Sequence, residues 1–243
     1  MNPIVLVTGA SRGIGYATAE TFHSKGWDVL TLSRHPFDSD VTWTDDPTTH
    51  IQFDLETPQY LDDAIAEIKH VLAGRPLNAL VNNAGISPKL PNGDRIGVVA
   101  ADLDFWQSIF NVNVFSPALL TRGLHSELKA AQGSVVNITS IVVQRVHPFA
   151  GSPYATSKAA LGGLTREMAA EFARDGIRVN AVSPGEIDTP ILSIKTQEII
   201  DSHVPMKRLG TPYEVADAVY YLCSPDSSYI TGSEVLVNGG QHL

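Results

Sequence analysis

The sequence predicts an α/β fold in which a parallel, doubly wound sheet of seven strands carries helices on both faces. Seven apolar runs of strand length recur along the 243 residues, and helical patterns lie between most of them. The first run leads at once into a glycine-rich turn and a helix. A chain of this length with 43% hydrophobic residues can fill one core, so we expect a single domain over residues 1–243.

The expected strands are short and apolar because both faces of such a sheet are buried. They cover Ile4–Thr8, Asp28–Leu32, His50–Phe53, Ala79–Asn82, Ser134–Thr139, Ile177–Val182 and Glu234–Val237. The helix after the first strand has one face suited to packing on a sheet, formed by Ile14, Ala17, Thr18, Thr21 and Phe22, and Gly26 suits its C-terminus.

Three later helices are expected to begin where a hydroxyl residue precedes a proline, at Thr57-Pro58, Ser152-Pro153 and Thr211-Pro212. In each pair the hydroxyl would cap the helix and the proline would occupy its first position. Glu214 stands three residues after Thr211 and completes a capping box.

Two stretches break the alternation of strands and helices. Pro36–Thr49 is polar, and we expect a surface loop there. Ile191–Leu209 follows a strand whose carboxyl end should face a ligand crevice, so we expect a substrate loop or lid near residues 191–209. A plain connecting loop is the alternative for this second stretch.

Composition excludes several function classes. With 26 acidic and 17 basic residues the formal net charge is −9, and no long basic run is present, so no nucleic-acid partner is expected. The single cysteine, Cys223, lies in an apolar helical stretch and is expected to be a buried structural thiol. No Cys/His cluster indicates a metal site. Neither a basic leader nor an apolar run of the ~18 residues that span a bilayer is present, so we expect a cytoplasmic protein.

The loop Thr8–Gly15 is the first candidate binding site. Its three glycines allow a tight turn at a strand end and close approach of backbone N–H groups to phosphate oxygens, and the following helix points its N-terminus at the same place. The glycine spacing differs from the usual dinucleotide fingerprint, and glycine-rich turns also serve only packing. The loop nevertheless predicts a bound dinucleotide.

Tyr154 and Lys158 are four residues apart and would share one face of a helix. A phenol is a poor acid or base at neutral pH, but a nearby cation stabilises the phenolate and lowers its pKa. Lys158 could supply that charge. Taken alone, the spacing is also typical of a surface pair.

Read together with other motifs, the chain resembles the short-chain dehydrogenase/reductase family from Pro3 to Gly240. The motifs follow in the family's order: Thr8–Gly15, Asp54-Leu55, Asn82-Asn83-Ala84-Gly85, Asn113 within Asn111–Val114, Asn137–Ser140, the Tyr154/Lys158 pair, Ile177–Gly185 with Thr189, and a closing segment from Arg208 to Gly240. The resemblance implies a Rossmann fold that binds NAD(P) and an oxidoreductase acting on a carbonyl or secondary alcohol.

The same resemblance implies a catalytic tetrad of Asn113, Ser140, Tyr154 and Lys158. Tyr154 would protonate the carbonyl oxygen as hydride arrives, and Ser140 would donate a stabilising hydrogen bond. Lys158 would lower the pKa of Tyr154 and hold the nicotinamide ribose. Asn113 would support a water path that resupplies the proton. A turn-closing serine and a packing amide are the alternatives for Ser140 and Asn113.

The second strand indicates which cofactor is bound. An acidic residue at its end would bind a ribose 2′-hydroxyl and repel a 2′-phosphate, but Ser33 occupies that position and Arg34 follows. Arg12 lies in the phosphate loop on the same side, and two guanidinium groups suit a phosphate dianion. NADP(H) is therefore favoured, with NAD(H) as the alternative if the arginines are only solvated surface charges.

The resemblance extends the cofactor site over several motifs. Asp54 should meet the adenine edge. The turn Asn83–Gly85 after the fourth strand should approach the adenosine ribose, and the segment after the sixth strand should hold the carboxamide. The expected cofactor-binding residues are Gly9, Ser11, Arg12, Gly13, Ile14, Gly15, Ser33, Arg34, Asp54, Leu55, Asn83, Ala84, Gly85, Tyr154, Lys158, Pro184, Gly185, Ile187 and Thr189.

The substrate is less defined. We expect Ser140, Gln144 and Tyr154 to face it, while Arg145 and His147 lie in the same segment and His147 could equally be an exposed loop residue. The leading hypothesis is an NADP(H)-dependent oxidoreductase for a small carbonyl or alcohol. A 3-oxoacyl-[acyl-carrier-protein] reductase is a more specific alternative, for which Lys195, Lys207 and Arg208 could form a cationic groove. A non-catalytic nicotinamide sensor is the alternative of another class.

Family resemblance also implies a homo-oligomer, a tetramer or a dimer. Long helices around Asp104–Lys129 and Tyr154–Arg174 would pack across a two-fold interface. Small residues of the second helix would allow close approach; they are Ala159, Ala160, Gly162 and Gly163.

Overall fold

A computed structural model describes residues 1–36, 41, 43, 49–189 and 196–243 of the chain. Its strands form one parallel sheet in the order β3-β2-β1-β4-β5-β6-β7. Their bounds are β1 (Ile4–Thr8), β2 (Asp28–Ser33), β3 (His50–Gln52), β4 (Ala79–Asn82), β5 (Ser134–Ile138), β6 (Arg178–Pro184) and β7 (Glu234–Val237). All seven predicted strands are confirmed, with ends that differ by at most two residues.

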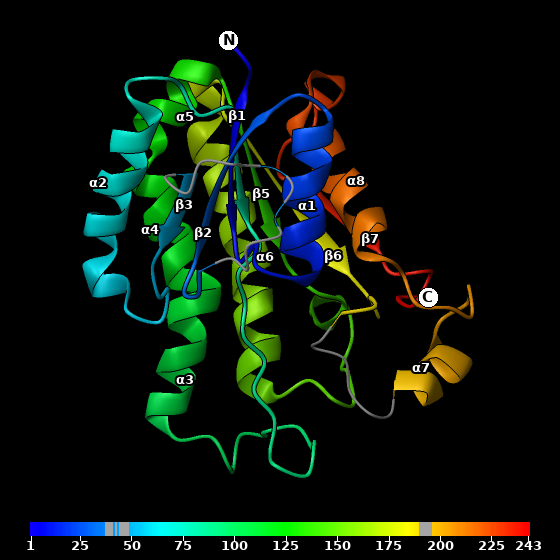
Figure 1. Cartoon of the computed structure of the whole chain (residues 1–243). Coiled ribbons are helices and arrows are strands. Elements are labelled where there is room, and N and C mark those ends of the chain that lie inside the picture. Colours follow the sequence, from blue (N-terminus) through cyan, green and yellow to red (C-terminus); the bar gives the residue numbers. More distant parts are fainter. Residues whose placement is uncertain (37–40, 42, 44–48, 190–195) are drawn as a thin grey trace.

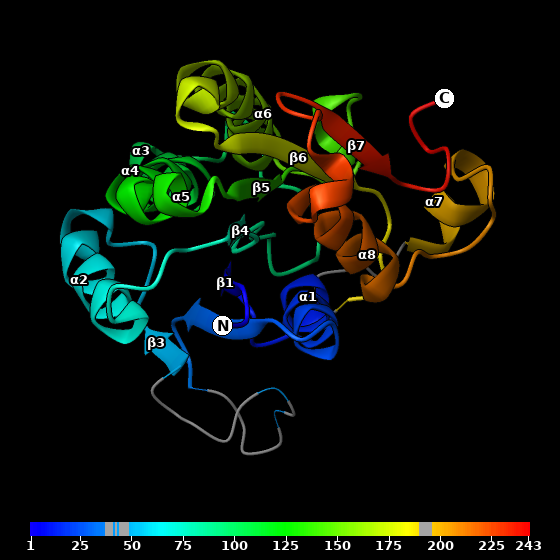
Figure 2. The ribbon, with the colours of Figure 1, turned by 90° about the horizontal axis from the view of Figure 1, so that it is seen from above.

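Helices cover both faces of the sheet, which confirms the doubly wound arrangement (Figure 2). On one face lie α1 (Gly13–Ser24) and α8 (Pro212–Cys223). On the other lie α2 (Leu61–Leu72), α4 (Ser116–Gly123), α5 (His125–Ala131) and α6 (Ser152–Phe172). In Figure 1 the strand β1 runs downward, and α3 (Leu103–Phe110) and α7 (Thr196–His203) lie in the lower part, toward the carboxyl ends of the strands.

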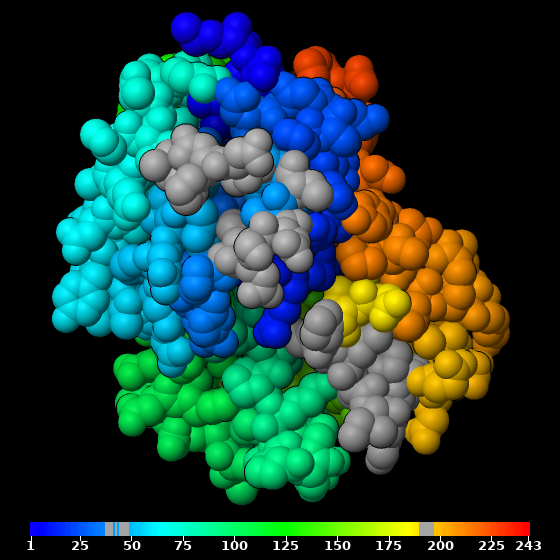
Figure 3. All heavy atoms as spheres, viewed as in Figure 1, coloured from blue at the N-terminus to red at the C-terminus, as the bar shows by residue number. Residues whose placement is uncertain are grey.

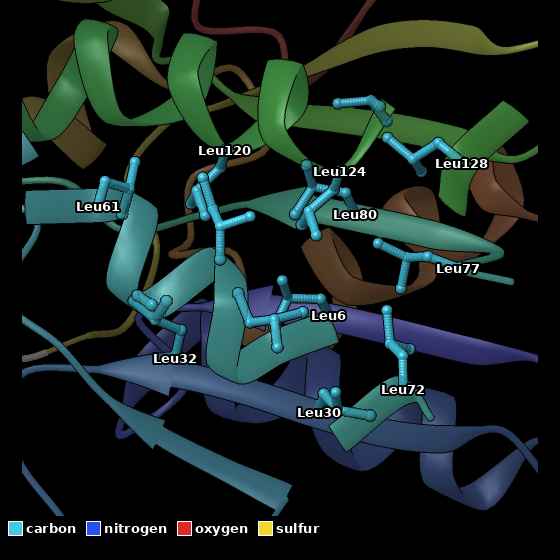
Figure 4. Packing of buried hydrophobic residues seen from close by; sticks show 14 of the residues in the cluster. Leu6, Leu30, Leu32, Leu61, Leu72, Leu77, Leu80, Leu120, Leu124 and Leu128 are labelled. Atoms are coloured by element: carbon cyan, nitrogen blue, oxygen red, sulfur yellow. The ribbon is translucent and has the colours of Figure 1, made fainter. Parts of the chain in front are cut away.

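Each face of the sheet has its own apolar core. Figure 4 shows leucines of the first core, where strand residues such as Leu6 and Leu80 meet helix residues such as Leu61 and Leu120. All four are at most 1% exposed. The second core includes Phe22 of α1 and Val219 of α8. These two cores fix the sheet between its helix layers and so fix the carboxyl ends of the strands.

The helix starts test the capping predictions. The capping box is confirmed, because Thr211 accepts from the backbone N–H of Glu214 while Glu214 accepts from that of Thr211. Thr57 precedes a short 3-10 turn, Pro58–Tyr60, and makes no side-chain cap. The prediction that Ser152 caps α6 is wrong: Gly151 is the N-cap, and a Cβ there would lie 2.7 Å from the carbonyl oxygen of Ile96. That close approach requires glycine.

The long helix expected around Asp104–Lys129 is divided. A π-helical turn, Asn111–Phe115, separates α3 from α4, and α5 follows. A π turn inserts one extra residue into the helical path and is frequent at functional sites. The helix expected over Tyr154–Arg174 ends at Phe172 and passes into a 3-10 turn, Ala173–Asp175.

The segment Pro36–Thr49 is only partly described. Residues 37–40, 42 and 44–48 lie outside the described part of the chain. Trp43, however, is 4% exposed, and its ring lies 4.6 Å from that of Tyr16 on α1. The prediction of a purely surface loop is therefore wrong at Trp43, because burial of an indole outweighs the polar character of its neighbours.

Among the helices of the described residues, none combines the length and apolar character that crossing a membrane requires. In the same residues no cluster of His, Cys, Asp and Glu is arranged to hold a metal ion. Cys223 is buried, and burial raises the pKa of its thiol to about 12. This agrees with the expected structural thiol.

Candidate active site

The carboxyl ends of six neighbouring strands, β1 to β6, open into one cleft of about 490 Å³. Figure 3 shows the face of the molecule on which the blue N-terminal segments, the green segment after β4 and the yellow segment after β6 approach one another. The cleft is lined by predicted site residues from most of the motifs: Gly9, Ser11, Arg12, Gly13, Ile14, Ser33, Arg34, Asp54, Leu55, Asn83, Ala84, Gly85, Ser140, Tyr154, Lys158, Pro184, Gly185, Ile187 and Thr189. Gly15, Asn113 and Gln144 lie outside its lining.

The glycine-rich loop is packed against the turn after β4. Gly9 has a φ of +67°, and a Cβ on it would lie 2.8 Å from the Cα of Ala84. A Cβ on Gly15 would overlap the carbonyl oxygen of Gly9 and the amide nitrogen of Asn83. Thr8 Oγ1 accepts the backbone N–H groups of Asn83 and Ala84, each at 3.0 Å. Gly15 thus belongs to the loop's packing rather than to the cleft wall.

The start of α1 is open toward the cleft. Its N-cap, Arg12, has extended backbone and makes no side-chain cap within the described residues. Uncapped N–H groups at a helix N-terminus attract anions. Arg12 and Gly13 both line the cleft, so this end of it suits a phosphate.

A second cationic group lies at the end of β2. Arg34 and His35 line the cleft, and Ser33 Oγ donates to the carbonyl of His35 at 2.8 Å. Gln52 of β3 donates to the carbonyl of Arg34 at 3.1 Å. These bonds hold the backbone at the strand end, while the exposed side chains of Arg34 and Arg12 border the same cleft.

Ser140, Tyr154 and Lys158 meet at the other end of the cleft. Ser140 precedes a 3-10 turn (Ile141–Val143) after β5, and it lines the cleft together with Tyr154. Lys158 lies one turn after Tyr154 on α6; its Nζ is 6.0 Å from the centre of the Tyr154 ring and donates to the carbonyl of Ile138 at 2.7 Å. The three residues therefore border the same part of the cleft.

Burial dominates the ionisation of this group. It raises the pKa of Tyr154 above its ordinary value, the hydrogen bond from Ser140 opposes this, and the charge of Glu186 adds to it. Burial also lowers the pKa of Lys158 to about 8. The expected net lowering of the Tyr154 pKa is thus not met, because desolvation of the buried phenol outweighs the attraction of an ammonium that is directed at a backbone carbonyl.

Asn113 lies in the π-helical turn and is fully buried. Its Oδ1 accepts from the backbone N–H of Ile86 at 2.9 Å, and its Nδ2 donates to the carbonyl of Ile86 at 3.1 Å and to Ser157 Oγ at 3.0 Å. The amide therefore joins α6 to the segment after Gly85, and a Cβ on Gly85 would lie near both Lys158 Nζ and Asn113 Oδ1. Asn113 thus supports the site but does not line the cleft.

Gln144 is directed away from the cleft, which corrects the prediction that it faces the substrate. Its Nε2 donates to Glu234 Oε2 of β7 at 2.8 Å. The other oxygen of Glu234 accepts from Thr139 Oγ1 at 2.6 Å. Glu234 thus holds both sides of the Ser140 loop, a contact that sequence reasoning missed because Glu234 looked like an ordinary strand residue.

Two further charged or polar groups line the cleft near Tyr154. His147 Nε2 and Glu186 Oε1 lie 2.7 Å apart, and their side chains are only 11% and 10% exposed. Glu186 was missed by sequence reasoning, although its place directly after Pro184-Gly185 could have drawn attention to it. For His147 the alternative of an exposed loop residue is excluded by this burial.

The expected lid is only partly described. Residues 190–195 lie outside the described part of the chain, Lys195 among them. The helix α7 and the residues after it follow, and Val204 is 2% exposed. Lys207 Nζ donates to the carbonyl of Asp201, and Arg208 pairs with Glu214 at 2.6 Å.

Comparison with known proteins gives consistent results. A family model described as enoyl-(acyl carrier protein) reductase matches residues 9–242. Protein FixR of Bradyrhizobium diazoefficiens is 52% identical over 241 residues, which cover 99% of this chain and 87% of that protein. The 3-oxoacyl-[acyl-carrier-protein] reductase FabG of Aquifex aeolicus is 34% identical over 251 residues, covering 98% of this chain and 96% of that protein.

A solved structure also resembles this chain in both fold and sequence. An oxidoreductase of the short-chain dehydrogenase/reductase family from Brucella ovis, in complex with a partially ordered NAD, superposes with a TM-score of 0.84. It is 48% identical, and the match covers 98% of this chain and 100% of that one. Family model, relatives and structure thus agree over nearly the whole chain.

Proposed function

The chain belongs to the short-chain dehydrogenase/reductase family, and on that basis we propose that it transfers a hydride between NADP(H) and a small carbonyl or secondary-alcohol substrate. The observation that carries this proposal is the meeting of Ser140, Tyr154 and Lys158 at one end of a cleft whose other end has the features of a phosphate site. An oxidoreductase needs both ends in one cleft.

The described residues fit a dinucleotide. A Cβ on Gly9 would lie 2.8 Å from Ala84 Cα, which leaves no room for it, and a Cβ on Gly85 would crowd Lys158 Nζ at 3.2 Å. The open N-terminus of α1 and the guanidinium of Arg12 would hold the phosphates, and Asp54 borders the place where adenine would lie. When bound, the nicotinamide supplies or accepts the hydride.

Tyr154 acts as the general acid in reduction. Its phenol O–H donates the proton to the substrate oxygen as negative charge develops there, and the phenolate regains a proton when the cycle closes. Ser140 O–H donates a hydrogen bond to the same oxygen. The Lys158 ammonium, beside the ring, stabilises the phenolate while it exists; in alcohol oxidation the proton moves the opposite way.

NADP(H) is the proposed cofactor. Ser33 leaves the end of β2 without a carboxylate that would repel a 2′-phosphate, and Arg34 and Arg12 border the cleft there. NAD(H) remains the competing cofactor, since the Brucella ovis relative carries NAD. The ratio of kcat/KM for NADPH and NADH decides between them.

A 3-oxoacyl-[acyl-carrier-protein] reductase is the second candidate. The name of the Aquifex aeolicus relative favours it. The described cations near α7 do not, because Arg208 is paired with Glu214 and Lys207 is directed at a backbone carbonyl. A β-ketoacyl thioester assay against a panel of simple ketones and alcohols, followed by NADPH absorbance, separates the two.

A third candidate is not an enzyme but a protein that senses the redox state of the nicotinamide cofactor without turnover. Retention of Ser140, Tyr154 and Lys158 around one space speaks for chemistry, because a sensor needs no general acid. The same substrate panel tests this, since a sensor turns over none of its members.

We further propose a homo-oligomer, a tetramer or a dimer. Leu103 and Phe115, at the two ends of the α3 and π-helical segment, are 70% and 48% exposed, so the segment leaves a large apolar side chain exposed at each end. Light scattering measures the subunit number.

A further inference from the structure

Glu186 forms part of the cleft wall beside Tyr154. It directly follows the Pro184-Gly185 turn at the end of β6, and its carboxylate lies near enough to raise the pKa of Tyr154. Neither the phosphate end of the cleft nor the proton transfer from Tyr154 uses this group. A carboxylate that is mostly buried at the place of reaction needs another explanation, because desolvating it is unfavourable.

His147 holds Glu186 but leaves its charge in place. The backbone N–H of Phe149 donates to His147 Nδ1 at 3.3 Å, so Nδ1 carries a lone pair and the ring proton is on Nε2. Nε2 therefore donates to Glu186 Oε1 as a neutral imidazole. The pair is a hydrogen bond with a net negative charge rather than two charges that cancel.

The C-terminal segment fixes the same carboxylate oxygen. Gln241 Nε2 lies 3.4 Å from Glu186 Oε1, and Arg145 donates to the carbonyl of Gln241 at 2.8 Å. Gln241 itself is 1% exposed and packs on Gly185, where a Cβ would lie 2.6 Å from its Oε1. The position of the Glu186 side chain is thus determined from two sides.

The second oxygen of Glu186 is available to a ligand. Both neighbours bond to Oε1, and within the described residues no hydrogen bond reaches Oε2. That oxygen is not among the buried polar atoms lacking a partner, so part of its surface is accessible, and Glu186 lines the cleft. A rigid carboxylate with one open oxygen is an acceptor for a substrate group that carries a hydrogen-bond donor.

We propose that Glu186 binds a hydroxyl group next to the reacting carbon, so that the preferred substrate is a hydroxylated carbonyl compound or its vicinal diol. This inference rests on the proposed oxidoreductase function. A neutral hydroxyl fits better than an ammonium, because Lys158 Nζ and Lys89 border the same cleft and would repel a cation. A simple ketone or alcohol would leave Oε2 desolvated without a donor.

The test compares three alcohols as substrates of the wild-type enzyme with NADP⁺: cyclohexanol, the vicinal cyclohexanediol, and the aminocyclohexanol with its amine on the neighbouring carbon. We expect kcat/KM for the diol to exceed that for cyclohexanol at least about tenfold, as one hydrogen bond to a charged group allows. Equal values, or a preference for the amine, would overturn the proposal.

Two variants assign the preference to Glu186. In Glu186→Ala the ratio of diol to cyclohexanol should fall toward one, and in Glu186→Gln, which keeps the shape and a neutral acceptor, it should fall only in part. Glu67→Gln, on the exposed outer side of α2, is the matched control and should keep the full ratio. An undiminished ratio in Glu186→Ala contradicts the inference, and melting temperatures of the variants identify any loss of folding.

Failure of the proposed function gives a different pattern. If the wild type turns over none of the three alcohols, the oxidoreductase assignment is in question for this substrate class. Calorimetric titration of the vicinal diol into the NADP⁺ complex then tests Glu186 alone. Tighter binding to the wild type than to Glu186→Ala supports the inference, and equal binding overturns it.

Discussion

Thr139 Oγ1 donates a hydrogen bond of 2.6 Å to Glu234 Oε1, and so ties the residue before Ser140 to the strand β7. Gln144, on the far side of the same loop, donates to the other oxygen. Ser140 is thereby held between two contacts to one carboxylate. Glu234 is a positioning residue in this account, because it touches neither the cleft nor the reacting groups.

Glu234→Ala should therefore lower kcat about tenfold while KM changes little, since a small displacement of a hydrogen-bond donor affects the transition state more than the ground state. Gln144→Ala removes only one of the two contacts and should have a smaller effect. Steady-state kinetics of the two variants provide the measurement. A rise in KM at constant kcat would instead indicate a role in binding.

Cofactor choice should depend on Arg34. Removing one charge-assisted hydrogen bond of about 1.5–3 kcal/mol should reduce kcat/KM for NADPH by one to two orders of magnitude in Arg34→Ala, and leave the value for NADH nearly unchanged. Arg12→Ala should act in the same direction. A wild-type preference for NADH, with a ratio that neither variant moves, would show that NADP(H) is the wrong assignment.

Reduction should lose rate on the alkaline side near pH 8. Burial raises the pKa of Tyr154, so the phenol keeps its proton well above neutrality, whereas burial lowers the pKa of Lys158 to about 8. As the pH rises through that value the ammonium becomes neutral and no longer stabilises the phenolate. The pH profile of kcat/KM tests this; a first alkaline limb beyond the ordinary pKa of a phenol, about 10, would contradict it.

The phosphate loop should not tolerate a side chain at Gly15. A Cβ there would overlap the carbonyl oxygen of Gly9 and the side-chain nitrogen of Asn83, both of which hold the loop. Gly15→Ala should thus lose dinucleotide binding and melt at a lower temperature. Gly97→Ala is the control, because a Cβ there would meet no atom within 4 Å. Fluorescence titration measures the affinity for the cofactor. An affinity in Gly15→Ala equal to that of the wild type would show that this close approach is not needed for binding.

Local sequence signals predicted the sheet and one end of the site. Apolar runs gave the strands, and the glycines around Gly9 gave the loop, because both depend on neighbours in the chain. The pair Tyr154 and Lys158 became informative only through the order of the other motifs. These features are set by short-range periodicity and turn chemistry, which a sequence displays directly.

The remaining features depend on contacts between distant segments. Thr139 and Glu234 are 95 residues apart, and His147 and Glu186 are 39 apart. Nothing in either pair's neighbourhood indicates the partner, since ordinary loop and strand residues surround them. Burial, which only the assembled fold determines, raises the pKa of Tyr154. The hydrogen bond from Lys158 to the carbonyl of Ile138 likewise depends on the assembled fold.

The central claim is that the hydroxyl group of Tyr154 supplies the transferred proton. Tyr154→Phe removes that hydroxyl and keeps the ring, so turnover of any accepted carbonyl should fall by at least about a hundredfold while NADPH binding persists. Stopped-flow measurement of NADPH oxidation beside a binding titration gives both values. A variant that oxidises NADPH at the wild-type rate would contradict the account.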